Sequence, residues 1–280
     1  MIKVRPHALH RIMGEPRSID PRLITDGVAA ILRRTKRTDE EKALIQSLKN
    51  RTLSEGAKTA VEEWVIERAY GFKDFAGNKY TEKGLTLEDH AIKTVQMNSL
   101  FTMGQYAHMN KNEQTFENQW LRGTPDIINP THGRDTKCSW SGVQHPWGNR
   151  KSNQKVKDAG YDVQCQAYMD LTDKPDWYVD FVLLPTPAEL VWGEDQREQQ
   201  VVLVEAIPLH KRIKTVHIPR DQAFIDLMHI KCELVQEYAA IYADEIGVLD
   251  VIQDRAKEYK VPFTKGVKSI LSKACHTRNK

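Results

Sequence analysis

The stretch GTPDIINPTHGRDTK, residues 123–137, decides the predicted fold, because it describes two short strands joined by a tight turn. Residues 123–128 give the first strand, with Pro125 near its start, where a missing backbone donor is tolerated. Residues 129–133 are turn formers, and residues 134–140 lead the chain back. The sequence therefore predicts a β-hairpin near the middle of the chain.

Two acidic side chains meet across this hairpin if its turn is centred between Pro130 and Thr131. Asp126 and Asp135 are then directly opposed, with their Cβ atoms about 4.5–5.5 Å apart. Lys137 follows Asp135 on the same face of the strand, because side chains alternate between the two faces. Two carboxylates and one ammonium group are therefore expected to converge on one spot.

Opposed carboxylates repel each other unless one is protonated or a cation lies between them. Mg²⁺ fits such a place, because it takes oxygen ligands and is often held by carboxylates together with water or phosphate oxygens. The same triplet also arises in surface hairpins with ordinary charges, since charged residues make up 28% of the chain. For the hairpin alone the interpretation as an ordinary surface hairpin is favoured. The surrounding sequence has to decide between that interpretation and a metal site.

The composition is that of an ordinary folded protein, with 40% hydrophobic residues. A length of 280 residues suffices for one large domain or two small ones. The net charge of +3 is mild, so the total charge does not indicate a nucleic-acid binder. The distribution of the charge has to decide that question.

Location and redox chemistry are also bounded by the sequence. It has no apolar run of about 18 residues, which a membrane span needs. The start MIKVRPHALHRIMGEP lacks the apolar core of a signal peptide, so a cytoplasmic protein without a membrane partner is expected. No Cys-x-x-Cys occurs, so neither a zinc nor an iron–sulfur site is expected. The four cysteines are scattered, at Cys138, Cys165, Cys232 and Cys275.

Helix signals fill the N-terminal part of the chain. Pro21 opens a predicted helix through TDGVAAILRR, and Thr38 begins a capping box for a helix that runs to about Lys49. Ser54 caps the next predicted helix, which Gly71 ends. These signals divide the chain into a helical N-terminal extension (1–52), a core domain (53–247) and a basic helical C-terminal tail (248–280).

A helix with an early glutamate precedes the hairpin. Residues 72–83 are predicted to be a loop, and Thr86 is predicted to start a helix that runs to about Phe101. Glu88 then lies in the first turn. It either complements the helix dipole or is a third carboxylate directed at the hairpin, and the spacing does not choose between these roles.

The segment 138–160 is predicted to be a long connection after the hairpin. Loops of this length inside a domain are usually functional or disordered. Interleaved basic and aromatic residues suit a nucleic-acid backbone and exposed bases, so the segment is either a lid over DNA or a polar flap. Its candidates for DNA contact include Trp140, Arg150, Lys151 and Lys155.

The remaining elements alternate in type. Residues 161–170 are predicted to be a helix, on which Gln164 and Tyr168 share one face. Residues 176–187 are predicted to be a strand, and residues 201–209 a further strand. A long amphipathic helix is predicted over 220–245. The tail from residue 255 carries eight Lys or Arg residues against one acid, which indicates a solvated tail or an auxiliary DNA contact.

The ordered pattern resembles the PD-(D/E)xK nuclease superfamily. The resemblance rests on GLTLEDHAI (84–92), Pro-Asp at 125–126, Asp-x-Lys at 135–137 and Gln-x-x-x-Tyr at 164–168. More narrowly, the chain is similar to the phage-type exonuclease branch that includes lambda exonuclease and the YqaJ-like viral recombinases. That similarity rests on the flanking sequences VRPHALHRIMGEP, LSEGAKTAVEEW and DTKCSWS.

The resemblance implies roles for individual residues. Asp126 and Asp135 would hold the metal with the Thr136 carbonyl, and Glu88 would bind a metal directly or through water. Lys137 would orient and activate the attacking water. The second acid is Asp135 where Glu is commoner, which shortens its reach by one methylene. The residues implied for DNA binding are Gln164, Tyr168, Ser139, Trp140, Arg150, Lys151 and Lys155.

A restriction-endonuclease-like α/β fold is implied, with a small mixed sheet flanked by helices. The implied function is a metal-dependent DNA exonuclease of phage origin that acts in recombination or replication with Mg²⁺, for which Mn²⁺ substitutes. DNA is the expected partner, and a single-strand annealing protein or a second copy of the chain are further ones. A structure- or sequence-selective endonuclease of the same fold and a non-cleaving DNA-binding accessory protein are the alternatives. Inactive relatives usually lose an acid or the lysine, and this chain keeps all three of those residues, which argues against the accessory protein.

Overall fold

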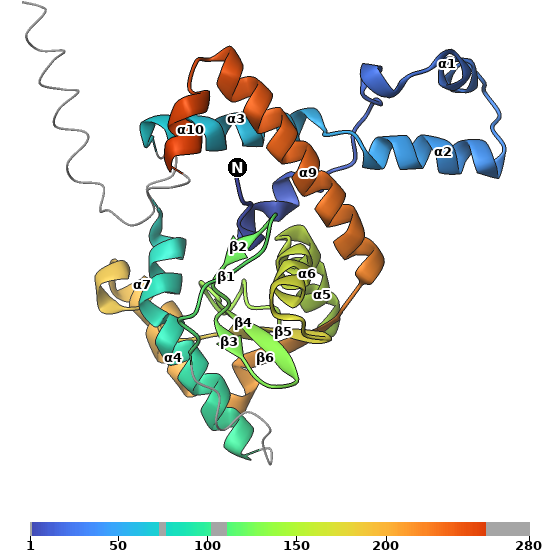
Figure 1. Ribbon diagram of the computed structural model, residues 1–280. Coiled ribbons are helices and arrows are strands. Elements are labelled where there is room, and N and C mark those ends of the chain that lie inside the picture. Colours follow the sequence, from blue (N-terminus) through green and yellow to red (C-terminus); the bar gives the residue numbers. More distant parts are fainter. Residues whose placement is uncertain (1, 73–76, 102–110, 256–280) are drawn as a thin grey trace, which may run out of the picture.

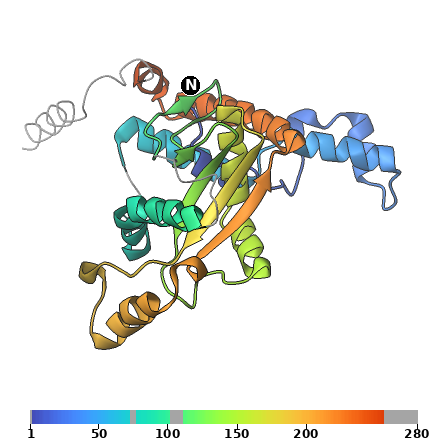
Figure 2. The ribbon, with the colours of Figure 1, turned by 90° about the horizontal axis from the view of Figure 1, so that it is seen from below.

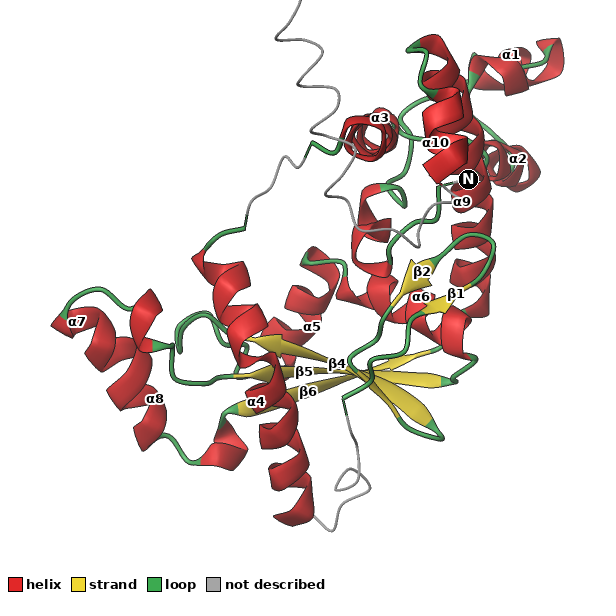
Figure 3. Cartoon of the chain, turned by 60° about the vertical axis from the view of Figure 1, so that its left-hand side comes forward, coloured by secondary structure: helices red, strands yellow, loops and turns green. Residues whose placement is uncertain are grey.

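A mixed four-stranded sheet forms the centre of the computed structural model, which describes residues 2–72, 77–101 and 111–255. The strand order is β3-β4-β5-β6, with β4 and β5 parallel and both outer pairs antiparallel (Figure 3). This is the small mixed sheet that the resemblance implied. Its strands are β3 (Ile127–Ile128), β4 (His132–Cys138), β5 (Asp176–Val182) and β6 (Ile213–Pro219).

Helices cover both faces of this sheet (Figure 1). Parallel strands need a crossover connection, and two helices supply it between β4 and β5. These two helices lie on one face of the sheet, and the long helix before the hairpin lies on the other. The crossover helices are α5 (Asn149–Asp158) and α6 (Tyr161–Thr172), and the long helix is α4 (Lys79–Phe101).

The alternation of side chains along β5 explains why both faces are covered. Trp177, Val179 and Phe181 point to α6 and are fully buried, whereas Val182 packs with Ala91 on the α4 side. A strand buried on both faces reads as a nearly continuous apolar run, as this segment does. Burying such large side chains stabilises the fold by roughly 1.5–3 kcal/mol each.

A glycine in β4 makes room for the largest of these side chains. A Cβ atom at Gly133 would lie 2.1 Å from the ring of Trp177, far closer than packed atoms approach. Only glycine therefore fits beside Trp177 on the neighbouring strand. This glycine, which the sequence assigned to the turn, thus lies in β4 and fixes the packing of the sheet.

A second apolar core lies beside the sheet and is built from helices far apart in sequence. Helix α3 packs along α9, and the N-terminal residues Val4 and Leu9 insert between them and α6. Figure 2 shows α9 running along one side of the molecule with the N-terminus against it. The helices of this layer are η1 (Pro6–Arg11), α3 (Glu55–Tyr70), α9 (Gln222–Glu245) and α10 (Leu249–Arg255).

Two helical arms extend from opposite ends of this body (Figures 2 and 3). The first arm follows η1, and the second is inserted between β5 and β6. Helix α2 of the first arm contains no buried residue, although the predicted capping box at its start is present. The first arm is η2 (Pro21–Leu23), α1 (Asp26–Leu32) and α2 (Asp39–Asn50); the second is η3 (Ala188–Leu190), α7 (Glu194–Arg197), η4 (Glu198–Val202), α8 (Leu203–Ala206) and η5 (Leu209–Lys211).

The predicted first strand of the hairpin, residues 123–128, is split. Gly123 belongs to β2, which pairs with β1 in a separate two-stranded sheet, whereas Ile127 begins β3 of the main sheet. Pro125 lies between them, and its missing N–H interrupts the ladder. The small sheet consists of β1 (Phe116–Glu117) and β2 (Arg122–Gly123).

The prediction for the start of the helix that carries Glu88 is wrong. Helix α4 begins at Lys79, because the side chain of Asn78 accepts hydrogen bonds from the backbone N–H groups of Tyr80 (3.0 Å) and Thr81 (3.1 Å). A glycine inside the helix, Gly84, conceals this start in the sequence. Glu88 therefore lies well inside the helix, so its interpretation as a first-turn dipole residue is wrong.

Two further predictions of element type are wrong. Residues 138–160 are not one long connection, because they contain α5, whose Ser152 and Val156 are buried at helical spacing. Residues 201–209 are not a strand: they continue from a π-helical turn into α8 and bury only Val204. The fourth strand is instead β6, which pairs with β5 over its whole length.

Pro21 does not open the predicted helix: it begins the separate turn η2, and α1 starts at Asp26 after its cap Thr25. The remaining predicted helices are present close to their expected ends. Helix α3 is capped by the Ser54 side chain and ends at Gly71, which has φ +78°. None of the helices that the structure describes is long and apolar enough to cross a membrane. Residues 256–280, with most of the predicted basic tail, lie outside the described part of the chain.

Candidate active site

The hairpin has the register that the turn residues predict. Ile127 pairs with Arg134 and Ile128 pairs with Gly133. Extending this register by one position sets Asp126 opposite Asp135. The backbone N–H of Thr136 donates to Oδ2 of Asp126 over 2.8 Å, which fixes the carboxylate against β4.

Lys137 completes the predicted triplet. Its Nζ lies 2.7 Å from Oδ2 of Asp135 and 4.8 Å from the centre of the Tyr161 ring. Asp135 is only 1% exposed, whereas a quarter of the Lys137 side chain reaches solvent. Tyr161 was not predicted as a site residue, although its spacing of three from Gln164 on one helix face is the signal that could have found it.

The charges of this cluster shift two pKa values in opposite senses. Burial and the charge of Asp135 raise the pKa of Asp126 well above that of an ordinary carboxyl group. Burial alone would lower the pKa of Lys137, but the attraction of Asp135 and Asp126 outweighs it and raises that pKa. Lys137 is therefore a fixed positive charge, whereas Asp126 gives up its proton less readily than an ordinary acid unless a further cation lies beside it.

Helix α6 presents the predicted Gln-x-x-x-Tyr residues to the hairpin. Nε2 of Gln164 donates to Oδ1 of Asp135 over 3.2 Å. The hydroxyl of Tyr168 donates to the carbonyl of Thr124, just before the first acid, over 3.2 Å. The two side chains thus orient the two strands that carry Asp126 and Asp135. The structure brings them to the site as supports of the hairpin.

Glu88 lies on the side of α4 that faces the hairpin. Its negative charge contributes to the raised pKa of Asp126, and its Oε1 lies 2.9 Å from Nζ of Lys111. Lys111 also pairs with Asp89 over 2.8 Å, and its backbone bridges to Ile127 of β3. Sequence reasoning missed Lys111, and no motif marks it. Among the described residues, no three His, Cys, Asp or Glu side chains are already gathered as a metal-binding group.

The residues predicted to touch DNA fall into two groups. Arg150 and Lys151 are exposed on the first turn of α5. Ser139 is 1% exposed and bonded to His145, and the carbonyl of Trp140 accepts a hydrogen bond from Lys83 of α4. The ring of Trp140 packs edge-on against Tyr80, 4.9 Å away.

Lys155 of α5 is half-buried. Its Nζ donates to the carbonyl of Gln144 over 3.2 Å, and it lies 5.3 Å from the centre of the Phe181 ring. Lys155 therefore joins α5 to the segment that follows β4.

Comparison with solved structures places the chain in a family. A phage-related exonuclease from Haemophilus somnus 129PT shares 35% sequence identity over 88% of this chain and 96% of its own, with a TM-score of 0.72. The chain belongs to the family of phage-related exonucleases. The family membership confirms the resemblance that the motifs predicted, and with it the α/β nuclease fold.

More distant similarity to exonuclease structures is also found. An alkaline exonuclease from Laribacter hongkongensis aligns at 15% identity over 91% of this chain and 94% of its own, with a TM-score of 0.44. The same enzyme in complex with dAMP aligns at 16% identity over the same shares, with a TM-score of 0.46. No family model and no curated protein matches the chain.

Proposed function

We propose that this member of the phage-related exonuclease family is a metal-dependent DNA exonuclease, with its active site at Asp126, Asp135 and Lys137. The observation that carries the proposal is the charge count at the hairpin. Two acids oppose each other and one base is paired with only one of them. Keeping both buried acids ionised is costly, as the raised pKa of Asp126 reflects, so a cationic ligand that favours the ionised pair is expected.

The donor set suits a hard divalent cation. Carboxylate oxygens of Asp126 and Asp135 and the backbone carbonyl of Thr136 are the ligands that Mg²⁺ or Mn²⁺ takes, and water fills the remaining positions. Glu88, on the same side, is placed to join them directly or through water once Lys111 releases it. When bound, such a cation supplies Lewis-acid stabilisation of the charge that develops on a phosphate.

The residues of this chain supply the rest of the chemistry. Lys137 is positively charged, partly exposed and next to the acids, so it is placed to attract the scissile phosphate and to stabilise the negative charge that hydrolysis builds. Gln164 holds Asp135, and the N–H of Thr136 holds Asp126, so neither carboxylate has to reorient when substrate arrives. Tyr161 lies under Lys137 and restricts its position.

One assay tests the reaction and its type. End-labelled linear DNA and closed circular DNA are incubated with the purified full chain, with Mg²⁺ and with EDTA. An exonuclease releases mononucleotides from the linear DNA in Mg²⁺ and leaves the circle intact. Cleavage of the circle would replace the proposal by an endonuclease of the same fold. If neither the linear nor the circular DNA is degraded with any divalent cation, the proposed function is wrong.

A further inference from the structure

A groove lies beside α5, outside the triplet of acids and lysine. It has a volume of about 580 Å³, within the range of roughly 300–1,000 Å³ typical of ligand sites. One wall runs along α5, with Arg150 and Lys151 at its start and Asp158 at its end, and the other is the segment 143–146 that follows β4. The exposed side chain of Val143 adds an apolar edge.

One residue of the groove wall carries a buried polar atom without a partner among the described residues. The imidazole of His145 is 1% exposed, and its Nδ1 is 2.9 Å from Oγ of Ser139. The other ring nitrogen, Nε2, has no hydrogen-bond partner among the described residues, although His145 lines the groove. Buried polar atoms are normally satisfied, so an unsatisfied one in a groove wall indicates a ligand. Burial lowers the pKa of His145 to about 4, so the ring is neutral at pH 7.

The groove is held in shape by contacts on both sides. Lys155 on α5 donates to the carbonyl of Gln144 in the opposite wall over 3.2 Å. Lys214 of β6 bonds the side chain of Asn149 at the start of α5. Trp147 packs edge-on against His145, 4.6 Å away, and its Nε1 donates to the carbonyl of Gly142. The site is therefore preformed.

The groove continues the face of β4 that carries the acids. Ser139, which holds His145, follows Lys137 on the same face of the chain, because side chains alternate. Two residues of strand span about 6.6 Å, so Ser139, which bonds a residue of the groove wall, lies near Lys137. Exposed cations at one wall suit a phosphate, and a neutral imidazole suits the hydrogen-bonding edge of a base.

We propose that this groove binds a neighbouring nucleotide of the same DNA strand, with its phosphate on Arg150 and Lys151 and its base edge at Nε2 of His145. The inference rests on the proposed function for the choice of DNA as ligand. It adds a subsite that is separate from the cleavage centre. Loss of this subsite weakens the affinity for the DNA strand, whereas loss of the acids stops the reaction.

Two lysines on α5 give a matched test. Lys151 lines the groove, whereas Lys157 is exposed on the same helix and does not. Binding of a short fluorescent oligothymidylate to the full-length chain is followed by anisotropy in EDTA, over a range of salt concentrations. Lys151→Ala is expected to weaken binding several-fold and to lower the slope of log K against log salt by about 0.7, the value for one lost contact to a single strand. Lys157→Ala is expected to change neither.

His145→Gln separates the base contact from the charge. It is expected to weaken binding without changing the salt slope, because a neutral ring releases no counterion. Equal effects of Lys151→Ala and Lys157→Ala on the affinity and on the salt slope would overturn the proposed subsite. Because binding is measured without a divalent cation, the outcome does not depend on cleavage. A chain that cleaves DNA but binds alike in both variants keeps its function and loses this subsite.

Discussion

The two faces of β4 carry two buried ion pairs with different charge counts. On the face toward α4, Arg134 donates to both oxygens of Asp180 over 2.7 and 2.6 Å, and neither side chain is more than 2% exposed. Thr215 adds a further hydrogen bond to Asp180 over 2.6 Å. On the other face, Asp135 pairs with Lys137, but Asp126 stands opposite as a second acid.

The two ion pairs show how a structural pair differs from a reactive one. Burying ions is costly, and a bidentate pair with one base per acid largely offsets that cost. Arg134 and Asp180 therefore neutralise each other and need no further ligand. At the site with two acids and one base, burial and the charge of Asp135 together raise the pKa of Asp126, so one acid remains without a balancing base. Burial is common to both faces, so the charge count is what marks the site.

The largest expected effect comes from removing either unbalanced acid. Asp126→Ala and Asp135→Ala are each expected to abolish Mg²⁺-dependent cleavage and to leave the fold intact, because each removes a metal ligand. Asp195→Ala in the distant α7 is the control and should cleave like the parent chain. Single-turnover cleavage and the far-UV circular dichroism spectrum are the measurements. Near-normal cleavage by either variant would refute the assignment of the site.

Removing the base of the same face should slow the reaction and keep the complex. Lys137→Ala is expected to lower the single-turnover rate by about 10²–10⁴-fold, the range for a lost catalytic proton-transfer group or charge-stabilising donor. Lys137→Arg should not restore the rate, because a planar guanidinium is bulkier and places its charge differently. Lys157→Ala serves as the control for charge. If Lys137→Ala changed only the affinity for DNA, Lys137 would be one phosphate contact among several.

The opposite face should respond in stability. Arg134→Met leaves Asp180 as a buried charge without its main partner and is expected to lower the free energy of unfolding by about 3–5 kcal/mol. The double variant Arg134→Met with Asp180→Leu should regain most of that loss, since no lone charge remains. Urea unfolding of the single and double variants measures both. A double variant as unstable as the single one would show that the pair itself contributes the stability.

The hairpin and its triplet were predictable because local rules fix them. The turn over 129–133 sets the register, and the register alone brings Asp126 opposite Asp135. The helix caps at Thr38 and Ser54 were read correctly for the same reason, since each depends on a neighbouring side chain. Features of this kind depend only on residues that are neighbours in the sequence, so the sequence alone predicts them.

The wrong predictions concern segments whose structure is decided by packing against distant parts of the chain. Helix α5 is so polar that only Val156 and Ser152 mark its buried side, and the run over 201–204 looks like a strand until the arm exposes most of it. Lys111 reaches Glu88 only because β3 bridges to it. Such contacts join segments far apart in the sequence, so the spacing of residues does not predict them.

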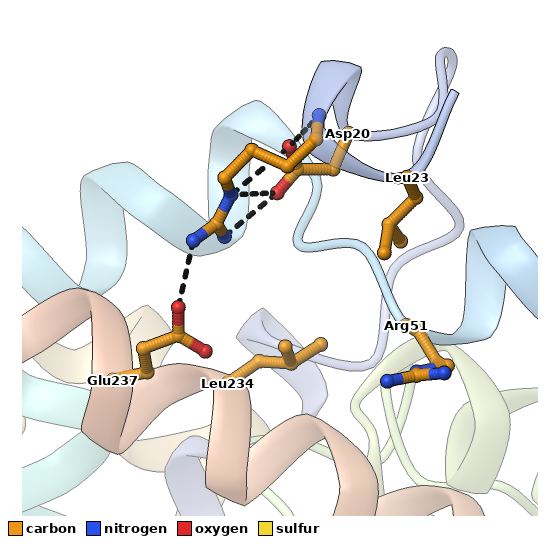
Figure 4. Close-up of a pocket in the computed structure, with 6 residues that line it drawn as sticks. Asp20, Leu23, Arg51, Leu234 and Glu237 are labelled. Atoms are coloured by element: carbon orange, nitrogen blue, oxygen red, sulfur yellow. Dashed lines mark hydrogen bonds and ion pairs between the residues drawn. The ribbon is translucent and has the colours of Figure 1, made fainter. Parts of the chain in front are cut away.

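A third small region on this molecule also depends on how distant segments meet. Where the N-terminal arm joins α9, Arg22 bridges Asp20 and Glu237, over 2.8 and 2.7 Å, beside a small pocket that Arg51 and Leu234 also line (Figure 4). Here one base faces two acids, as at the hairpin, but all three side chains reach solvent. Surface pairs of this kind contribute roughly 0–1 kcal/mol, because water screens them. An imbalance of charge therefore marks a site only where water is excluded.

The smallest expected effect concerns Lys83, a buried lysine that pairs with no acid in the part of the chain that the structure describes. Lys83 of α4 is 1% exposed and donates to the carbonyls of Trp140 and Leu184, each over 2.9 Å. Burial lowers its pKa from 10.5 to about 8, the reverse of the shift at Lys137. Between these two pH values the unfolded chain binds more protons than the folded one, so stability should rise with pH.

The rise is largest between pH 8 and pH 10, where it should amount to about 2 kcal/mol from Lys83 at 1.36 kcal/mol per pKa unit. Buried Lys231, with its pKa also lowered to about 8, adds a rise of the same sign, whereas buried thiols such as Cys165, whose pKa is raised, act in the opposite sense. The difference between the parent chain and Lys83→Met cancels both contributions and isolates Lys83. Urea unfolding at several pH values measures that difference. Parallel pH profiles for the two proteins would mean that Lys83 is not strained by its burial, and that the two carbonyls balance its charge as fully as the acids balance Lys137.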